Sequence, residues 1–171
     1  MATVFVPNHC QVDDSLDTIT RGLDVNGRSL GPRQASSSSD PQKTGLMRQR
    51  MVAVVEDDPS MLKSIARLLK AHDFQPVTFT SAEAFLQAAA ATTAVCLVLD
   101  LHLGGMSGIE LRRQLTASGS NLPVVFMSAA DDESVRQKAV EAGCVAYFRK
   151  PFLARHLICA INNAVVPETG T

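Results

Sequence analysis

Carboxylates follow two apolar runs of the chain. Glu56 and Asp57 come directly after residues 51–55, and Asp100 comes directly after residues 95–99. If the two runs are neighbouring strands of a parallel sheet, the three carboxylates meet at one edge of that sheet. Carboxylates held close together repel one another, and a divalent cation that prefers oxygen ligands relieves the repulsion. The pattern therefore predicts a Mg²⁺ site.

A hydroxyl and an ammonium group follow two later apolar runs. Ser128 comes directly after residues 123–127, and Lys150 lies just beyond residues 145–148. An ammonium group pairs with a phosphate oxygen, and a hydroxyl group donates a hydrogen bond to another. Placed at the same edge as the acidic residues, this pair indicates phosphate chemistry at the predicted Mg²⁺ site.

Short apolar runs alternate with amphipathic patterns from residue 51 onward. Valine-rich runs are typical of strands buried on both faces of a parallel sheet, and amphipathic patterns are typical of covering helices. The expected strands are 51–55, 74–77, 95–99, 123–127 and 145–148. Five strands that alternate with five helices predict an α/β fold with a doubly wound parallel sheet, and in such sheets ligands bind beyond the carboxyl ends of the strands.

Local signals mark where several of the helices begin and end. Asp58 is the expected N-cap of a first helix that opens with Pro59, and Ser107 and Glu110 have capping-box spacing. A fourth helix is expected to begin near residue 131 and to stop at Gly143. The apolar face of the fifth helix is expected to carry Leu153, Leu157, Ala160, Ile161 and Ala164.

Composition describes one soluble globular domain and excludes several other classes. The chain has 171 residues, of which 46% are hydrophobic and 19% charged, and its formal net charge is −1. The charge balance provides no basic field for nucleic acid. No apolar run approaches the roughly 18 residues of a membrane span, and no secretion signal opens the chain. The four cysteines lie far apart, without metal-ligand spacing, so we expect a cytoplasmic protein.

The chain changes character near residue 47. Residues 1–47 are rich in Gly, Ser, Pro and Asn, and we expect a disordered extension with one short extended piece over 3–6. The folded domain is expected over 48–166, and residues 167–171 form a flexible tail. An alternative is that translation starts at Met47 or Met51.

Five stretches together resemble the receiver domain of two-component response regulators, of the single-domain type. They are residues 54–62, 97–103, 106–111, 123–129 and 146–152. The resemblance begins at Met51 and excludes the extension. It implies a flavodoxin-like sheet with strand order 2-1-3-4-5.

The resemblance implies a role for each matching residue. Asp100 would be the phospho-acceptor. Mg²⁺ would be held by Glu56, Asp57 and Asp100, with the backbone carbonyl of His102 completing the protein's share of the metal shell.

Three more residues receive roles from the same resemblance. Lys150 would pair with the phosphoryl group, and the Lys150–Pro151 peptide would be cis. Ser128 would move toward the phosphoryl group, and Tyr147 would be the aromatic switch that turns inward. A buried aromatic at a strand end is the plainer alternative for Tyr147.

Two positions depart from the family pattern. Gly104 stands where the family usually has proline, and Gly105 follows it, so we expect a more flexible loop. Ser128 replaces the commoner threonine and keeps the hydroxyl donor.

The implied function is phospho-acceptance in a phosphorelay rather than turnover as an enzyme. The expected partners are a histidine kinase or phosphotransferase and a downstream protein, or the domain acts as a phosphate sink. Few residues follow the fifth expected helix, so no output domain is expected. One alternative is a degenerate receiver that binds proteins without phosphorylation. Another is a phosphohydrolase, but His102 stands where that class has a second aspartate.

Overall fold

A computed structural model describes residues 4–5, 50–129 and 133–165. Six strands form one sheet in the order β1-β6-β5-β4-β2-β3. The strands are β1 (Val4–Phe5), β2 (Arg50–Val55), β3 (Phe74–Phe79), β4 (Cys96–Asp100), β5 (Val124–Ser128) and β6 (Ala146–Arg149). Strands β2 to β6 pair in parallel, and their order is the predicted 2-1-3-4-5. The predicted flavodoxin-like α/β fold is confirmed.

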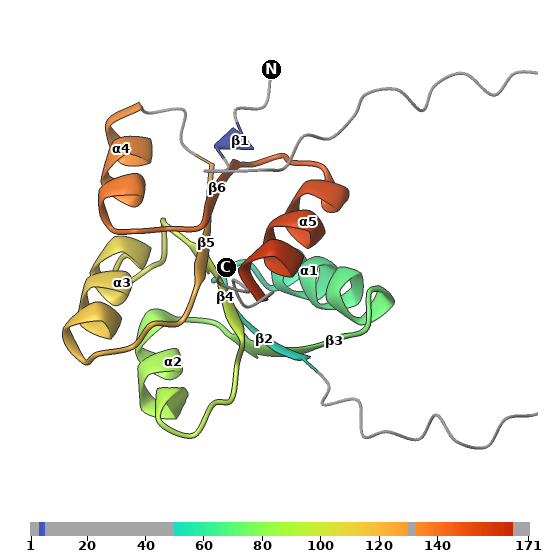
Figure 1. Cartoon of the computed structure of the whole chain (residues 1–171), viewed down its shortest axis with the longest axis horizontal. Helices are drawn as coiled ribbons and strands as arrows, with labels where there is room; N and C mark the ends of the chain where they lie inside the picture. Colours follow the sequence, from blue (N-terminus) through green and yellow to red (C-terminus); the bar gives the residue numbers. More distant parts are fainter. Residues whose placement is uncertain (1–3, 6–49, 130–132, 166–171) are drawn as a thin grey trace, which may run out of the picture. The chain divides into compact units, whose positions relative to one another are not determined.

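Five helices cover the two faces of the sheet. They are α1 (Pro59–Ala71), α2 (Ala82–Ala89), α3 (Gly108–Ala117), α4 (Glu133–Glu141) and α5 (Ala154–Val165). Helices α1 and α5 cover one face, and α2, α3 and α4 cover the other (Figure 1). Each face therefore has a core of its own, as a doubly wound sheet requires.

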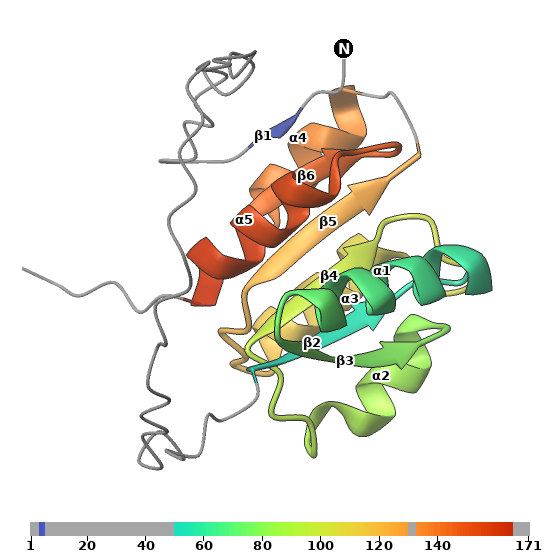
Figure 2. The same ribbon diagram turned by 90° about the vertical axis from the view of Figure 1, so that its right-hand side faces the viewer.

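Successive side chains of the central strands point alternately into the two cores. Val52 and Val54 belong to the core beneath α1 and α5, whereas Ala53 and Val55 belong to the core beneath α2, α3 and α4. Side chains alternate between the faces of a strand, so a strand buried on both faces is apolar throughout. The polar residues that end these strands emerge at one edge, and Figure 2 shows the parallel strands running toward it.

Helix caps follow the local sequence signals. The carboxylate of Asp58 accepts a hydrogen bond from the main-chain N–H of Ser60 at 2.8 Å, and Ser107 and Glu110 form the predicted capping box. Gly143 has a φ of +76° just after α4, a conformation that favours glycine. The expected start of this helix near residue 131 lies outside the described residues.

The prediction for Leu153 was wrong. Helix α5 begins at Ala154, and the side chain of Leu153 is 51% exposed rather than part of the core. The residue sits in the connection after β6, where the helical spacing that suggested burial has not yet begun.

One strand lies outside the five-stranded pattern. Strand β1 pairs with β6 antiparallel, with Val4 opposite Phe148 and Phe5 opposite Tyr147. It falls within the extended piece expected over 3–6. The predicted disordered extension and the tail otherwise lie outside the described residues. No helix among residues 50–129 and 133–165 is long and apolar enough to cross a bilayer.

Candidate functional site

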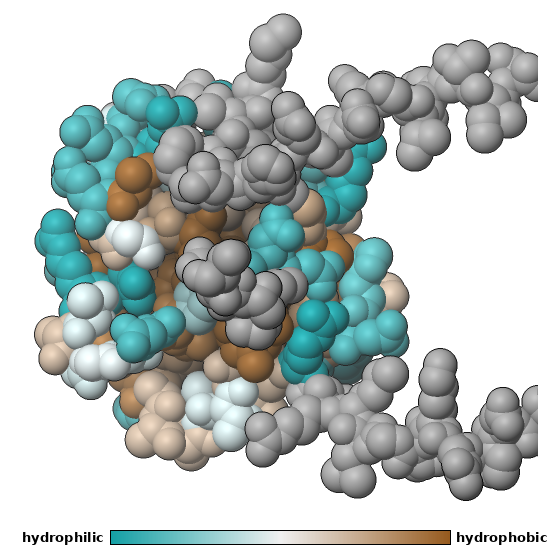
Figure 3. Space-filling view, viewed as in Figure 1, coloured by the Kyte–Doolittle hydropathy of each residue, from teal (hydrophilic) through white to brown (hydrophobic). Residues whose placement is uncertain are grey.

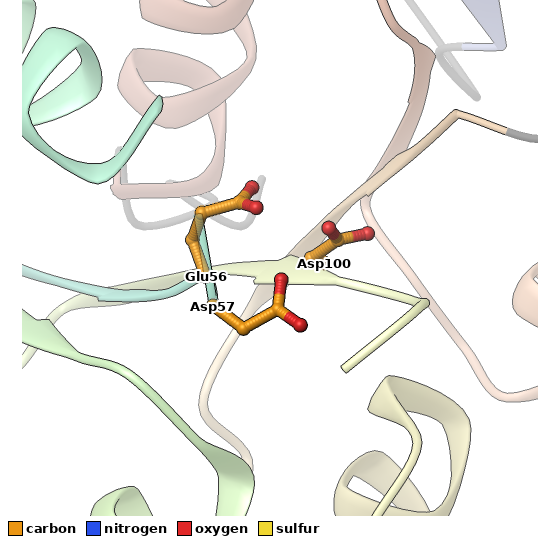
Figure 4. A group of neighbouring side chains, drawn as sticks. All are labelled: Glu56, Asp57 and Asp100. Atoms are coloured by element: carbon orange, nitrogen blue, oxygen red, sulfur yellow. The ribbon is translucent and has the colours of Figure 1, made fainter. Parts of the chain in front are cut away.

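Three carboxylates meet at the carboxyl edge of the sheet. Glu56 and Asp57 follow β2 directly, and Asp100 is the last residue of β4. The two strands are neighbours, with Val55 opposite Leu99. One oxygen from each of the three side chains lies within 4.8 Å of the others, and Figure 4 shows the carboxylates facing a common space. The predicted acidic cluster is therefore confirmed as a geometric group.

The cluster is buried on one side and open on the other. Glu56 is 1% exposed and Asp100 is 4% exposed, whereas Asp57 is exposed. Burial is the largest influence on Glu56 and raises the pKa of its carboxyl group, against the hydrogen bond from Lys150. The three oxygen donors suit Mg²⁺, which takes one or two carboxylates and completes its shell with water or phosphate oxygens. The exposed side of Asp57 leaves access for them.

Lys150 joins the two buried carboxylates. Its ammonium group donates to Glu56 Oε2 at 2.6 Å and to Asp100 Oδ2 at 2.7 Å. Burial lowers the pKa of Lys150, but the hydrogen bonds to Asp100 and Glu56 outweigh it and raise the pKa overall. The lysine is thus held charged beside the carboxylates of Asp100 and Glu56. The Lys150–Pro151 peptide is cis, as predicted.

A main-chain contact orients the Asp100 carboxylate from the other side. Its Oδ1 accepts a hydrogen bond from the main-chain N–H of His102 at 3.1 Å, while Oδ2 faces Lys150. The carboxylate is thus held at both oxygens, and its orientation is fixed. The metal role of the His102 carbonyl stays a prediction.

Ser128 ends β5 at the same edge and is fully buried. Its hydroxyl lies 3.3 Å from Nδ1 of His102, within hydrogen-bond distance. The sequence suggested a role only for the backbone of His102, so this side-chain contact was missed. Its position could have indicated the contact, because His102 lies only two residues beyond Asp100, the last residue of β4.

Tyr147 is buried in this structure, with 3% of its surface exposed. It packs in the core beneath α2, α3 and α4 and lies opposite Phe126 in the sheet. Ser128 follows Phe126 by two positions and so points to the same face. Tyr147 is therefore a core residue in this structure, and its switching role stays a prediction.

Glu83 holds the loop after β4 in place, a role that the sequence did not indicate. This α2 residue accepts a hydrogen bond from the main-chain N–H of Met106 at 2.9 Å, and that bond is the main cause of the lowered pKa of Glu83. A Cβ added to Gly105 would lie 2.8 Å from Glu83 Oε1. The Gly104–Gly105 loop is therefore fastened to α2, and Gly105 allows the close approach.

Comparison with protein families identifies a matching domain family. The model of the response regulator receiver domain matches residues 52–162. Response regulator protein TodT of Pseudomonas putida is 33% identical over 129 residues, which cover 73% of this chain and 57% of TodT. Transcriptional regulatory protein TdiR of Thauera aromatica is 35% identical over 114 residues, which cover 67% of this chain and 50% of TdiR. The match thus spans about half the length of these relatives.

Solved structures agree with the sequence comparison. The crystal structure of FixJ-N is 33% identical, with a TM-score of 0.66, and the match covers 73% of this chain and 100% of that one. The low-resolution structure of response regulator StyR is 38% identical, with a TM-score of 0.64, and the match covers 68% of this chain and 59% of StyR.

Proposed function

The chain belongs to the response regulator receiver domain family, and from that premise we propose that Asp100 accepts a phosphoryl group from a phosphohistidine. A receiver domain is a signalling module rather than a true enzyme, and it implies a histidine kinase partner. The observation that carries the proposal is the Lys150 ammonium, which lies within 2.7 Å of both Asp100 and Glu56.

The transfer exchanges one bond to phosphorus for another. A carboxylate oxygen of Asp100 attacks the phosphorus in line, and the bond from phosphorus to the donor imidazole breaks. The imidazole leaves with the electron pair and takes up a proton. Phosphoryl transfer needs little covalent help, so positioning and charge stabilisation carry most of the catalysis.

The residues around Asp100 supply both the positioning and the charge stabilisation. Lys150 neutralises charge on the phosphoryl oxygens, and the main-chain N–H of His102 holds the carboxylate in orientation. Mg²⁺, held by Glu56, Asp57, Asp100 and the expected His102 carbonyl, would add positive charge beside those oxygens. Water hydrolyses the resulting acyl phosphate and restores the carboxylate.

The output would pass through the surface formed by α4, β6 and α5. Ser128 would hydrogen-bond to the phosphoryl group, and the inward arrangement of Tyr147 would become the dominant one. A complete shift of a two-state population, from 1:99 to 99:1, requires about 5.5 kcal/mol of differential interaction. A charge-assisted pair and a hydrogen bond in a partly dry site can approach that amount. The partner on this surface would be a downstream protein.

A degenerate receiver that only binds proteins is the second candidate. Its support is the glycine-rich loop at residues 104–105, in place of the family's usual proline. Glu83 fastens that loop, and the acidic cluster is complete with its lysine. These contacts favour the first candidate, a receiver domain that is phosphorylated, over the degenerate one.

The test uses a small acyl-phosphate donor with Mg²⁺ and intact-mass measurement. The wild-type chain is expected to gain one phosphoryl group, and the isosteric variant Asp100→Asn is expected to gain none. An unmodified wild type with an intact fold and no Mg²⁺ binding would instead favour the degenerate receiver.

A further inference from the structure

The imidazole of His102 makes a contact that phosphoryl transfer itself does not need. Its Nδ1 lies 3.3 Å from the hydroxyl of Ser128, while the main-chain N–H of the same residue binds Asp100 Oδ1 at 3.1 Å. One residue thus touches both the acceptor and the switch hydroxyl. The Ser128 side chain is fully buried, whereas His102 lies at the exposed rim.

The direction of the Ser128 hydroxyl matters for Tyr147. Ser128 and Tyr147 belong to neighbouring strands and point to the same face of the sheet, because Phe126 lies opposite Tyr147 and precedes Ser128 by two positions. A hydroxyl directed toward His102 points to the loop that follows Asp100. In this arrangement Tyr147 is buried among the residues beneath α2, α3 and α4. The hydroxyl contact and the buried tyrosine therefore occur together.

We infer that His102 is a positioning residue for the switch: its imidazole holds the Ser128 hydroxyl on the acceptor side and so favours the inward arrangement of Tyr147. The inference rests on the proposed function and adds a side-chain role to a residue whose main chain already contacts Asp100. A phosphoryl oxygen on Asp100 would take over as the partner of Ser128, so His102 biases the same equilibrium that phosphorylation completes.

The size of the bias follows from a single hydrogen bond. One net intramolecular hydrogen bond changes a two-state ratio by about fivefold. That factor is well below the roughly 10⁴-fold preference that a complete switch requires. His102 would therefore set the resting balance and leave most of the response to phosphorylation.

Three substitutions of His102 separate the hydrogen bond from the ring. His102→Asn keeps a polar group near the place of Nδ1 and can serve as donor or acceptor toward Ser128. His102→Gln carries the same amide one bond farther out, and His102→Ala removes it. All three alter an exposed side chain, and circular dichroism checks that each variant folds.

The chain contains one tyrosine and no tryptophan, so its ultraviolet-excited emission reports on Tyr147. Acrylamide quenching of this emission is measured in the protein without phosphodonor. We expect quenching to increase, by at most about fivefold, in His102→Ala and His102→Gln, and to stay near wild type in His102→Asn. In a Ser128→Ala background, His102→Ala is expected to add nothing.

Each outcome decides the inference separately from the proposed function. Unchanged quenching in His102→Ala would overturn the inference, as would an equal increase in His102→Asn or an undiminished effect without the Ser128 hydroxyl. Intact mass after acyl-phosphate treatment is measured for every variant in parallel. A His102→Ala chain that is phosphorylated but quenched like wild type leaves the function standing and removes His102 from the switch. A wild type without adduct removes the function, while the quenching series still decides the His102 contact.

Discussion

The ammonium group of Lys150 lies 2.7 Å from Oδ2 of Asp100, although 50 residues separate the two along the chain. The same nitrogen lies 2.6 Å from Glu56, which is 94 residues away. One cation thus neutralises two buried anions that arrive on different strands. The stability of the site and its affinity for metal should both depend on this arrangement.

Replacement of Lys150 by methionine should destabilise the protein by about 3 kcal/mol, because it leaves two buried carboxylates without their cation. Mg²⁺ should recover a larger share of stability in this variant than in the wild type, since it can take over part of the neutralisation. Urea denaturation with and without Mg²⁺ measures both effects. Lys63 is exposed on α1, and Lys63→Met should change stability by less than about 0.5 kcal/mol. Similar losses in the two variants would contradict the prediction.

Two adjacent aspartates should respond differently to the same substitution. Asp57 contributes an oxygen to the acidic cluster, so Asp57→Asn should weaken Mg²⁺ binding by about tenfold or more. Asp58 is the N-cap of α1, and asparagine caps helices as well as aspartate. Asp58→Asn should therefore leave Mg²⁺ affinity within about twofold of wild type. Titration calorimetry measures both, and equal weakening would place Asp58 in the metal site.

The stability of the metal-free protein should depend on the ionisation of Glu56. Burial raises the pKa of this carboxyl group in the folded state, so the folded protein holds the proton more tightly than the unfolded chain. The resulting stabilisation is fully present below the unfolded pKa and is lost as pH rises through the folded pKa. The pKa of Lys150 is also raised, but its contribution is lost only at alkaline pH.

Glu56→Gln provides the comparison because glutamine does not titrate. As pH rises above the ordinary glutamate pKa of about 4.3, the wild type should lose stability relative to the variant in Mg²⁺-free buffer. Free energies of unfolding from denaturant curves at several pH values give the difference. Parallel curves for the two proteins would show that Glu56 has the same pKa in both states.

Gly108 should tolerate no side chain. A Cβ at this position would lie 2.4 Å from the main-chain oxygen of Asp100 and 3.1 Å from the Cα of Leu101, and backbone atoms cannot move aside as a flexible side chain does. Gly108→Ala should therefore destabilise the protein by about 2–3 kcal/mol. The nearest contact of a Cβ at Gly104 is an ordinary 3.8 Å, to Asp57 Oδ2, so Gly104→Ala should lie within about 0.5 kcal/mol of wild type. Denaturant midpoints distinguish the two, and a stable Gly108→Ala would mean that α3 can shift away from β4.

The hydropathy surface shows why the sequence described the fold well. Apolar side chains lie between polar outer surfaces (Figure 3). The regular spacing of apolar residues along the sequence predicts this division. Strands buried on both faces are continuously apolar, and the helices carry an apolar stripe. Local caps need only residues a few positions apart, as Asp58 with Ser60 and Ser107 with Glu110.

The site residues were predictable because parallel strands end at one edge. Glu56, Asp57, Asp100, Ser128 and Lys150 each follow an apolar run, so strand order alone brings them close. The sequence by itself therefore determined the fold class and the chemistry available at the edge.

Tertiary structure alone decided how those groups pair. The bond from Met106 to Glu83 and the contact of Ser128 with His102 are two such pairings. Each joins segments that are distant along the chain, and each depends on side-chain direction and on the separation of packed elements. The spacing of apolar residues along the sequence specifies which edge of the sheet a residue reaches. The packing of the elements in three dimensions sets the partner that it meets there.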